Sequence, residues 1–222
     1  MQIYPLGIII YKMGNGSEKI IQILQKRYDE KTYRGEPFRT LIGVILSHQT
    51  NDKISWPATD RLFEAANTPE DFVKLGVRKI DSRIKDVNYH PTKAKRIYLV
   101  CKMLIERFGG KVPKIREELM ELPGVGPKSA DIVLSYAFGV PTIAIDIHVA
   151  TISKRLHWTN EKDIEKIKRD IEKEIPKKYW LLANSLLVDF GKEICAAKPK
   201  CYMCPLVKMC PYERKNFQKV GK

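Results

Sequence analysis

A lysine at the predicted start of a helix is the side chain whose position most strongly suggests covalent chemistry. Lys128 follows Leu122-Pro-Gly-Val-Gly-Pro, a stretch that predicts a tight turn between two helices. The positive end of a helix dipole disfavours a nearby ammonium and so favours the neutral amine. A neutral amine is a nucleophile that can form a Schiff base, whereas an ammonium can bind phosphate. The local sequence leaves both roles equally open.

The turn before this lysine has the composition of an anion-binding hairpin. We expect Gly124 and Gly126 to let the chain reverse through positive φ angles, with backbone N–H groups free to approach a phosphate. Val125, between them, is expected to pack inward. An ordinary turn between two helices is the alternative, because glycine turns are common there.

A carboxylate follows the lysine by eighteen residues, after an apolar run that ends at Ile145. Asp146 is predicted to cap the next helix, which contains His148. Capping uses one carboxylate oxygen, so the other could still face a cation. A catalytic role for Asp146 requires that Lys128 lie nearby.

Four cysteines fall within sixteen residues, spaced as Cys195-x5-Cys201-x2-Cys204-x5-Cys210. Structural zinc sites usually use two close cysteine pairs, and only one C-x2-C pair is present. Wider, uneven spacing favours a [4Fe–4S] cluster over zinc. The loop and its flank are also basic, which could place them on phosphates or simply in solvent. The basic residues are Lys198, Lys200, Lys208 and Arg214.

Two polar turns interrupt the helical pattern. Gln49 lies in Ser47-His-Gln-Thr-Asn-Asp52, directly after an apolar helix, and its amide could read a base edge. A plain helix end capped by Asn51 or Asp52 is the simpler interpretation from local sequence. Tyr89 and His90 lie in a second turn, Asn88-Tyr-His-Pro91, that proline is expected to stiffen.

Apolar residues recur with a period near 3.6 along the chain, and no convincing strand alternation appears, so the predicted fold class is all-α. A nearly all-apolar helix over residues 37–46 should be central to a core. Helix starts are expected at Ser17 and at Thr68-Pro69, and a further helix should contain Val77, Ile80, Ile84 and Val87. Residues 31–36 are predicted to be a linker.

The chain is strongly basic, with 40 Lys and Arg against 26 Asp and Glu and a net charge of +14. Such a balance fits a polyanionic partner such as nucleic acid about as well as selection for solubility. No stretch reaches the roughly 18 apolar residues of a membrane span. We therefore expect a soluble, monomeric protein without a targeting signal, located in the cytoplasm with the nucleoid.

Together these residues resemble the endonuclease III branch of the helix-hairpin-helix (HhH-GPD) DNA glycosylases. The resemblance covers residues 37–210 and rests on the hairpin with Lys128, the segment Val140–His148, the Gln49 segment and the four-cysteine loop. It implies two all-α domains with a DNA-binding cleft between them. A six-helix domain would span residues 30–140, and residues 1–29 with 141–222 would form a cluster domain.

The resemblance also implies an activity: base-excision repair with AP lyase chemistry on double-stranded DNA that contains oxidised pyrimidines or abasic sites. Lys128 would attack the sugar C1′ of a flipped nucleotide, with Asp146 as its partner, and β-elimination would nick the strand. Gln49, Tyr89 and His90 would fill the gap. The hairpin Gly124-Val125-Gly126 and His148 would contact DNA, and the four cysteines would hold a structural [4Fe–4S] cluster.

The chain departs from the family pattern in three places. The first cysteine spacing is one residue short, the gap-filling turn carries Tyr89-His90, and residues 1–16 match nothing recognisable. Mismatch thymine or adenine glycosylases of the same fold are an alternative, although they generally lack the hairpin lysine. A non-catalytic DNA-binding module is the other alternative.

Overall fold

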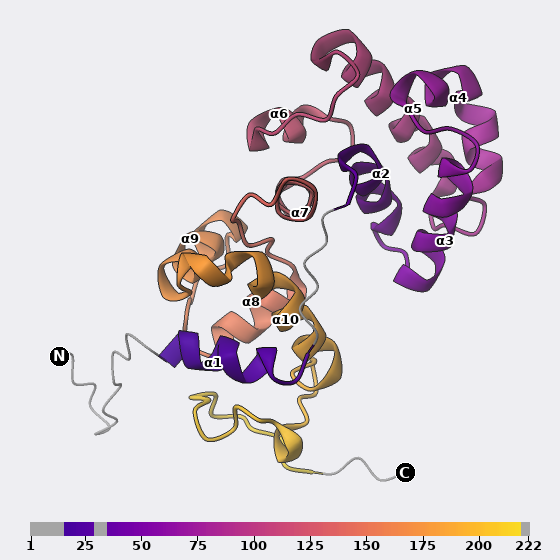
Figure 1. Cartoon of the computed structure of the whole chain (residues 1–222). Coiled ribbons are helices and arrows are strands. Elements are labelled where there is room, and N and C mark those ends of the chain that lie inside the picture. Colours follow the sequence, from indigo (N-terminus) through magenta and orange to yellow (C-terminus); the bar gives the residue numbers. More distant parts are fainter. Residues whose placement is uncertain (1–15, 29–34, 219–222) are drawn as a thin grey trace. The chain divides into compact units, whose positions relative to one another are not determined.

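The computed structural model describes residues 16–28 and 35–218, and within them it contains helices and loops but no strand (Figure 1). The predicted all-α class is therefore confirmed. None of the helices in these residues is long and apolar enough to cross a membrane. Residues 1–15 and most of the predicted linker lie outside the described residues.

The chain divides into two compact units. A central unit comprises Thr32–Ala144, and a terminal unit combines Met1–Lys31 with Ile145–Lys222. Residues 141–144 belong to the central unit, four residues beyond the expected end at 140. Within this segment, the Thr142 hydroxyl donates to Asp131 of α7 at 3.0 Å.

Over its described residues, 35–144, the central unit contains six helices. They are α2 (Pro37–Ser47), α3 (Asp52–Phe63), α4 (Pro69–Arg83), α5 (His90–Phe108), α6 (Arg116–Glu121) and α7 (Pro127–Phe138). Helix α2 packs against α3, α5 and α7, and Leu41, Ile42 and Ile45 on it are fully buried. The rings of Phe38, Phe63 and Phe72 pack together nearby with centroids 5.2–5.5 Å apart, and Phe38 meets the other two edge-on. The expectation that residues 37–46 lie at the centre of a core is confirmed.

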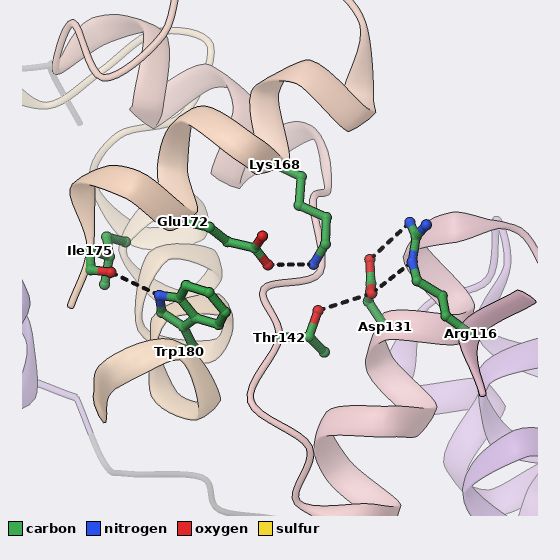
Figure 2. Close-up of polar contacts among 7 residues, drawn as sticks. All are labelled: Arg116, Asp131, Thr142, Lys168, Glu172, Ile175 and Trp180. Carbon is green, nitrogen blue, oxygen red and sulfur yellow. Dashed lines mark hydrogen bonds and ion pairs between the residues drawn. The ribbon is translucent and has the colours of Figure 1, made fainter. Parts of the chain in front are cut away.

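The terminal unit packs α1 (Gly16–Gln25) and α8 (Ile147–Arg155) against α10 (Trp180–Glu193). Helix α9 (Ile164–Glu174) is joined to α10 by the short η1 (Lys177–Tyr179), and η2 (Cys201–Met203) lies in the cysteine loop. Trp180 Nε1 donates to Ile175 O at 2.8 Å, which fixes the connection from α9 to α10 (Figure 2). Lys168 and Glu172 form an ion pair at 2.8 Å one turn apart on α9.

Helix starts follow the predicted caps with one exception. Asn51 caps α3, and Thr68 caps α4 in a reciprocal capping box with Asp71. The prediction that Ser17 is a cap is wrong, because Ser17 lies inside α1 and its hydroxyl donates to Glu174 O at 2.5 Å. A tertiary hydrogen bond has replaced the local one.

Helix α4 is broken in the middle. Gly76 has a φ of 77°, so the segment consists of two short helices, as the separate patterns around Thr68 and Val77 predicted. The second ends at Arg83, earlier than expected. Ile84 and Val87 are still buried, because the chain after the helix continues to pack on the core.

Candidate active site

The hairpin between α6 and α7 forms as predicted, but its two glycines differ. Gly124 has a φ of 84°, in the left-handed region that favours glycine. Gly126 has a φ of −100° and is extended, so the expected positive φ is wrong there. Its conformation is open to any residue, and a Cβ on it would meet nothing within 4 Å. Val125 is 5% exposed and packs in the core, as expected.

Lys128 is the second residue of α7 and is exposed. Pro127 before it occupies the first position of the helix, where no backbone N–H is needed. The hairpin therefore presents the amine to solvent from the N-terminal turn of a fixed helix. Arg96 of α5 lies against the same turn, because a Cβ at Gly124 would meet its Cδ at 2.9 Å.

A buried ion pair ties α7 to its neighbours. Asp131, 2% exposed in its side chain, accepts from Arg116 Nε at 3.0 Å and Nη2 at 3.3 Å, and from the Thr142 hydroxyl at 3.0 Å (Figure 2). Arg116 is on α6 and Thr142 is on the segment after α7. One carboxylate thus fixes both helices of the hairpin and the chain that leaves it.

Asp146 caps α8 as predicted, with Oδ1 accepting from Val149 N–H at 2.8 Å. This bond uses one of its two carboxylate oxygens. His148, two residues later, packs closely on α10, since a Cβ at Gly191 would meet its ring within 2.9 Å. Asp146 and His148 belong to the terminal unit, whereas Lys128 belongs to the central unit.

The two polar turns predicted to contact DNA lie together in the central unit. Gln49 is exposed and has a left-handed φ of 51°. Asn88 Nδ2 donates to the Gln49 carbonyl, which joins the first turn to the second. Tyr89 is 67% exposed with a φ of 59°, whereas His90 is half-buried and bonds to Asp81 through Nδ1 at 2.7 Å. Tyr89, rather than His90, is therefore the protruding side chain.

A buried lysine lies beneath the Gln49 turn. Lys93 of α5 is 2% exposed, and burial lowers its pKa to about 8. Its amine donates to Leu46 O at 2.7 Å, His48 O at 2.6 Å and Thr50 Oγ1 at 2.9 Å. An ammonium has three N–H groups, and here each has an acceptor.

His48 links the Gln49 turn to the helix that carries Lys128. Its Nε2 lies 2.8 Å from the hydroxyl of Ser129, the residue after Lys128. Burial first, and then the positive charges of Lys93, Lys128 and Arg96, hold the pKa of His48 below its ordinary value. The imidazole is therefore neutral at neutral pH.

The four loop cysteines are free thiols that line a single cavity of the terminal unit, together with apolar side chains that include Ile152, Leu156 and Phe190. Burial raises the pKa of Cys204 to about 11 and also raises that of Cys195. Across residues 16–28 and 35–218, no group of three or more His, Cys, Asp or Glu side chains is arranged to hold a metal ion. Four thiols around one partly apolar cavity nevertheless supply the donor set that a [4Fe–4S] cluster requires.

Arg155 at the end of α8 holds this loop in place. Its Nη1 donates to Cys195 O and Ala196 O, both at 2.8 Å, and to Cys195 Sγ at 3.2 Å. Its guanidinium also lies over the ring of Tyr212, 5.0 Å from the centroid. Lys198, Lys200, Lys208 and Arg214 of the same region are exposed.

Reasoning from the sequence missed Lys93, Arg96, Ser129 and Arg155. Lys93 and Arg155 bond mainly to backbone carbonyls, which have no signature in a sequence. The His48–Ser129 pair spans 81 residues. Of these four residues, only Lys93 has a signal in the sequence. It shares the buried face of α5 with Ile97 and Val100, which predicts that Lys93 is buried.

Comparison with known proteins identifies the family of this chain. Residues 42–177 match the HhH-GPD superfamily of base excision DNA repair proteins. Endonuclease III of Bacillus subtilis is 38% identical over 185 residues, which cover 82% of this chain and 84% of the relative. The chain belongs to the HhH-GPD superfamily, within its endonuclease III family.

Solved structures of HhH-GPD proteins share the fold. A trapped endonuclease III–DNA covalent intermediate superposes with a TM-score of 0.82 at 35% identity, covering 90% of this chain and 96% of that one. A thermostable thymine-DNA glycosylase superposes with a TM-score of 0.80 at 24% identity, covering 89% and 96%. The second likeness concerns the fold alone. This family member therefore has the two-domain helix-hairpin-helix architecture.

Proposed function

We propose that this chain is a bifunctional DNA glycosylase and AP lyase of base-excision repair. It acts on duplex DNA with a damaged base, for which an oxidised pyrimidine is the expected lesion, or with an abasic site. One observation carries the proposal: the endonuclease III family match includes a hairpin that presents Lys128, exposed, from the first turn of α7. The DNA substrate would place the protein with the nucleoid.

The proposed chemistry begins with the Lys128 amine. It attacks C1′ of the flipped nucleotide, and the base leaves with the electrons of the glycosidic bond and takes up a proton while the amine loses one. The C1′–O4′ bond of the sugar ring then opens, O4′ takes up the remaining amine proton, and the nitrogen is left doubly bonded to C1′ as a Schiff base. Loss of the C2′ proton and departure of the 3′ phosphate then nick the strand. Asp146 would assist with the carboxylate oxygen that does not cap α8.

We assign the other predicted DNA contacts according to how exposed each residue is. The backbone of Gly124, Val125 and Gly126 would hold a phosphate at the start of α7, where a helix N-terminus favours an anion. Gln49 and Tyr89 are exposed on adjoining turns and would fill the space left by the flipped nucleotide. His90 would support that turn through Asp81, and His148 would contact DNA from α8.

We also propose a [4Fe–4S] cluster, held by Cys195, Cys201, Cys204 and Cys210. The four thiols share one cavity, and each would ligate one iron. When bound, the cluster would contribute structure and take no part in the bond-breaking steps. The surrounding residues would anchor the loop and present its exposed lysines to DNA phosphates.

Borohydride trapping tests the nucleophile. We expect wild-type protein to form a covalent adduct when duplex DNA with an abasic site is incubated with it and reduced. Lys128→Ala should abolish the adduct, because no amine remains to form the Schiff base. Lys102→Ala, which removes an exposed lysine on α5, should trap like wild type.

The alternatives give other outcomes. An adduct that persists in Lys128→Ala would show that another amine reacts. A mismatch-specific glycosylase would release thymine or adenine without nicking, and a binding module would retain duplex without releasing a base. Lys128 argues against the mismatch branch, whose members generally lack the hairpin lysine.

A further inference from the structure

The Gln49 turn adopts a conformation that needs support. Gln49 has a φ of 51°, where a residue other than glycine costs about 1 kcal/mol or more. The turn is short, since Thr50 N–H donates to Ser47 O at 3.1 Å. Something beyond the turn itself must hold Gln49 in place.

Lys93 supplies that support from below. Its ammonium donates to Leu46 O, His48 O and Thr50 Oγ1, so all three N–H groups bond to residues that flank Gln49. Leu46 O and His48 O lie at the C-terminal end of α2, where carbonyls lack helical partners and a cation is favoured. The side chain is 2% exposed, so water does not compete for these bonds.

Two further contacts extend the support to neighbouring parts of the central unit. Asn88 Nδ2 donates to the Gln49 carbonyl, and Asn88 directly precedes the exposed Tyr89. His48 Nε2 lies 2.8 Å from the Ser129 hydroxyl on the helix that carries Lys128. The turn that carries Gln49 is therefore held by α5, by the Tyr89 turn and by α7.

We propose that Lys93 is a positioning residue that preorganises the Gln49 turn for entry into a DNA duplex. This proposal rests on the proposed function above. Because Lys93 is buried, it acts through its bonds to Leu46, His48 and Thr50, and these bonds hold Gln49 in one conformation before DNA binds. Asn88 supports the same turn through its bond to the Gln49 carbonyl.

Comparing a duplex substrate with a single-stranded one distinguishes positioning of Gln49 from catalysis by Lys128. Gap filling is needed only where a nucleotide leaves a stacked duplex, whereas an abasic site in a single strand leaves no opposite base to hold. Attack by Lys128 is common to both substrates. A positioning defect should therefore reduce nicking of duplex DNA and spare nicking of single-stranded abasic DNA.

The test compares Lys93→Met with Lys102→Met on the two substrates, at matched temperature and with melting temperatures recorded. Methionine retains most of the buried stem of Lys93 and removes its donors. We expect Lys93→Met to lose about tenfold or more in kcat/KM on the duplex, and less than about twofold on the single strand. Lys102, exposed on the same helix, should change neither value.

A double-mutant comparison shows whether Lys93 acts through Gln49. The double variant Gln49→Ala with Lys93→Met should lose no more duplex activity than Gln49→Ala alone. If Lys93 acts by positioning the Gln49 side chain, removing Lys93 has no further effect once that side chain is gone. Asn88→Ala, an exposed and mild change, repeats the test if Lys93→Met does not fold. Asn88→Ala should also reduce kcat/KM more on the duplex than on the single strand, by a smaller factor than Lys93→Met.

Equal losses on duplex and single strand would overturn the proposal and leave Lys93 with a purely structural role. Multiplicative losses in the Gln49→Ala double variant would also overturn it. Failure of the proposed function would look different, because wild-type protein would then nick neither substrate.

Discussion

Asp146 and Asp163 are two aspartates with the same local structure and different expected roles. Each caps a helix of the terminal unit, with Oδ1 accepting from a backbone N–H three residues on, at 2.8 Å for Asp146 and 3.0 Å for Asp163. Capping therefore cannot distinguish them. The family resemblance singles out Asp146 as the partner of the lysine.

Replacing each aspartate by asparagine separates capping from charge. Asparagine caps helices about as well as aspartate, so both variants should melt within about 2 °C of wild type. Asp146→Asn should lower base excision about 100-fold, because the negative carboxylate is gone. Asp163→Asn should excise like wild type. Single-turnover excision rates and melting temperatures of the two variants test this prediction. Equal excision rates would show that Asp146 only caps its helix.

At the scale of elements, Arg155 joins a helix to the cysteine loop. Its guanidinium donates to the carbonyls of Cys195 and Ala196 and to Cys195 Sγ. Hydrogen bonds from a charged donor are stronger than neutral ones, and removing the donor leaves the loop carbonyls without it. The loop should therefore be held in its path by α8 even before any cluster binds.

Arg155→Met should loosen the loop by on the order of 2 kcal/mol. We expect faster protease cleavage between Cys195 and Cys210, less iron per chain, and weaker absorbance at about 400 nm. Lys154→Met, which changes the exposed neighbour, is the matched control. Iron content and cleavage rates equal to those of the control would contradict this role.

The same scale shows what the sequence could predict. Asn51, Thr68 and Asp146 were predictable as caps because a cap is a contact over two or three residues. Val125 was predictable as buried because it is an apolar residue between two glycines. Gly126 was not predictable as extended, because Gly124 alone reverses the chain and the sequence of the hairpin does not show which glycine does so.

Contacts distant in sequence were not predictable. Lys93 bonds to Leu46 and His48, 47 and 45 residues away, and nothing local marks a lysine as the support of a turn. The local sequence predicts Ser17 as a cap, but its hydroxyl bonds to Glu174 O, 157 residues away. The all-α fold and the local caps were therefore predictable from the sequence, whereas hydrogen bonds between residues far apart in the chain required the structure.

For the whole molecule, the net charge of +14 predicts DNA binding that depends strongly on salt concentration. Each phosphate neutralised by a lysine or arginine releases counterions, so affinity should fall linearly on a logarithmic salt scale. The exposed Lys198 and Lys208 belong to the cysteine loop, and they are two of the four basic residues whose role as phosphate contacts the sequence left open.

We expect Lys198→Ala and Lys208→Ala each to weaken duplex binding at low salt and to reduce the salt slope by about 1, because each removes one phosphate contact. The loss should be the same for damaged and undamaged duplexes, since such contacts carry no base information. Lys102→Ala should leave the slope unchanged, although it removes the same charge. Titrations at several salt concentrations measure this directly. Equal slopes for all three variants would mean that the loop is solvated, and that net charge alone rather than its placement on this loop steers the protein to DNA.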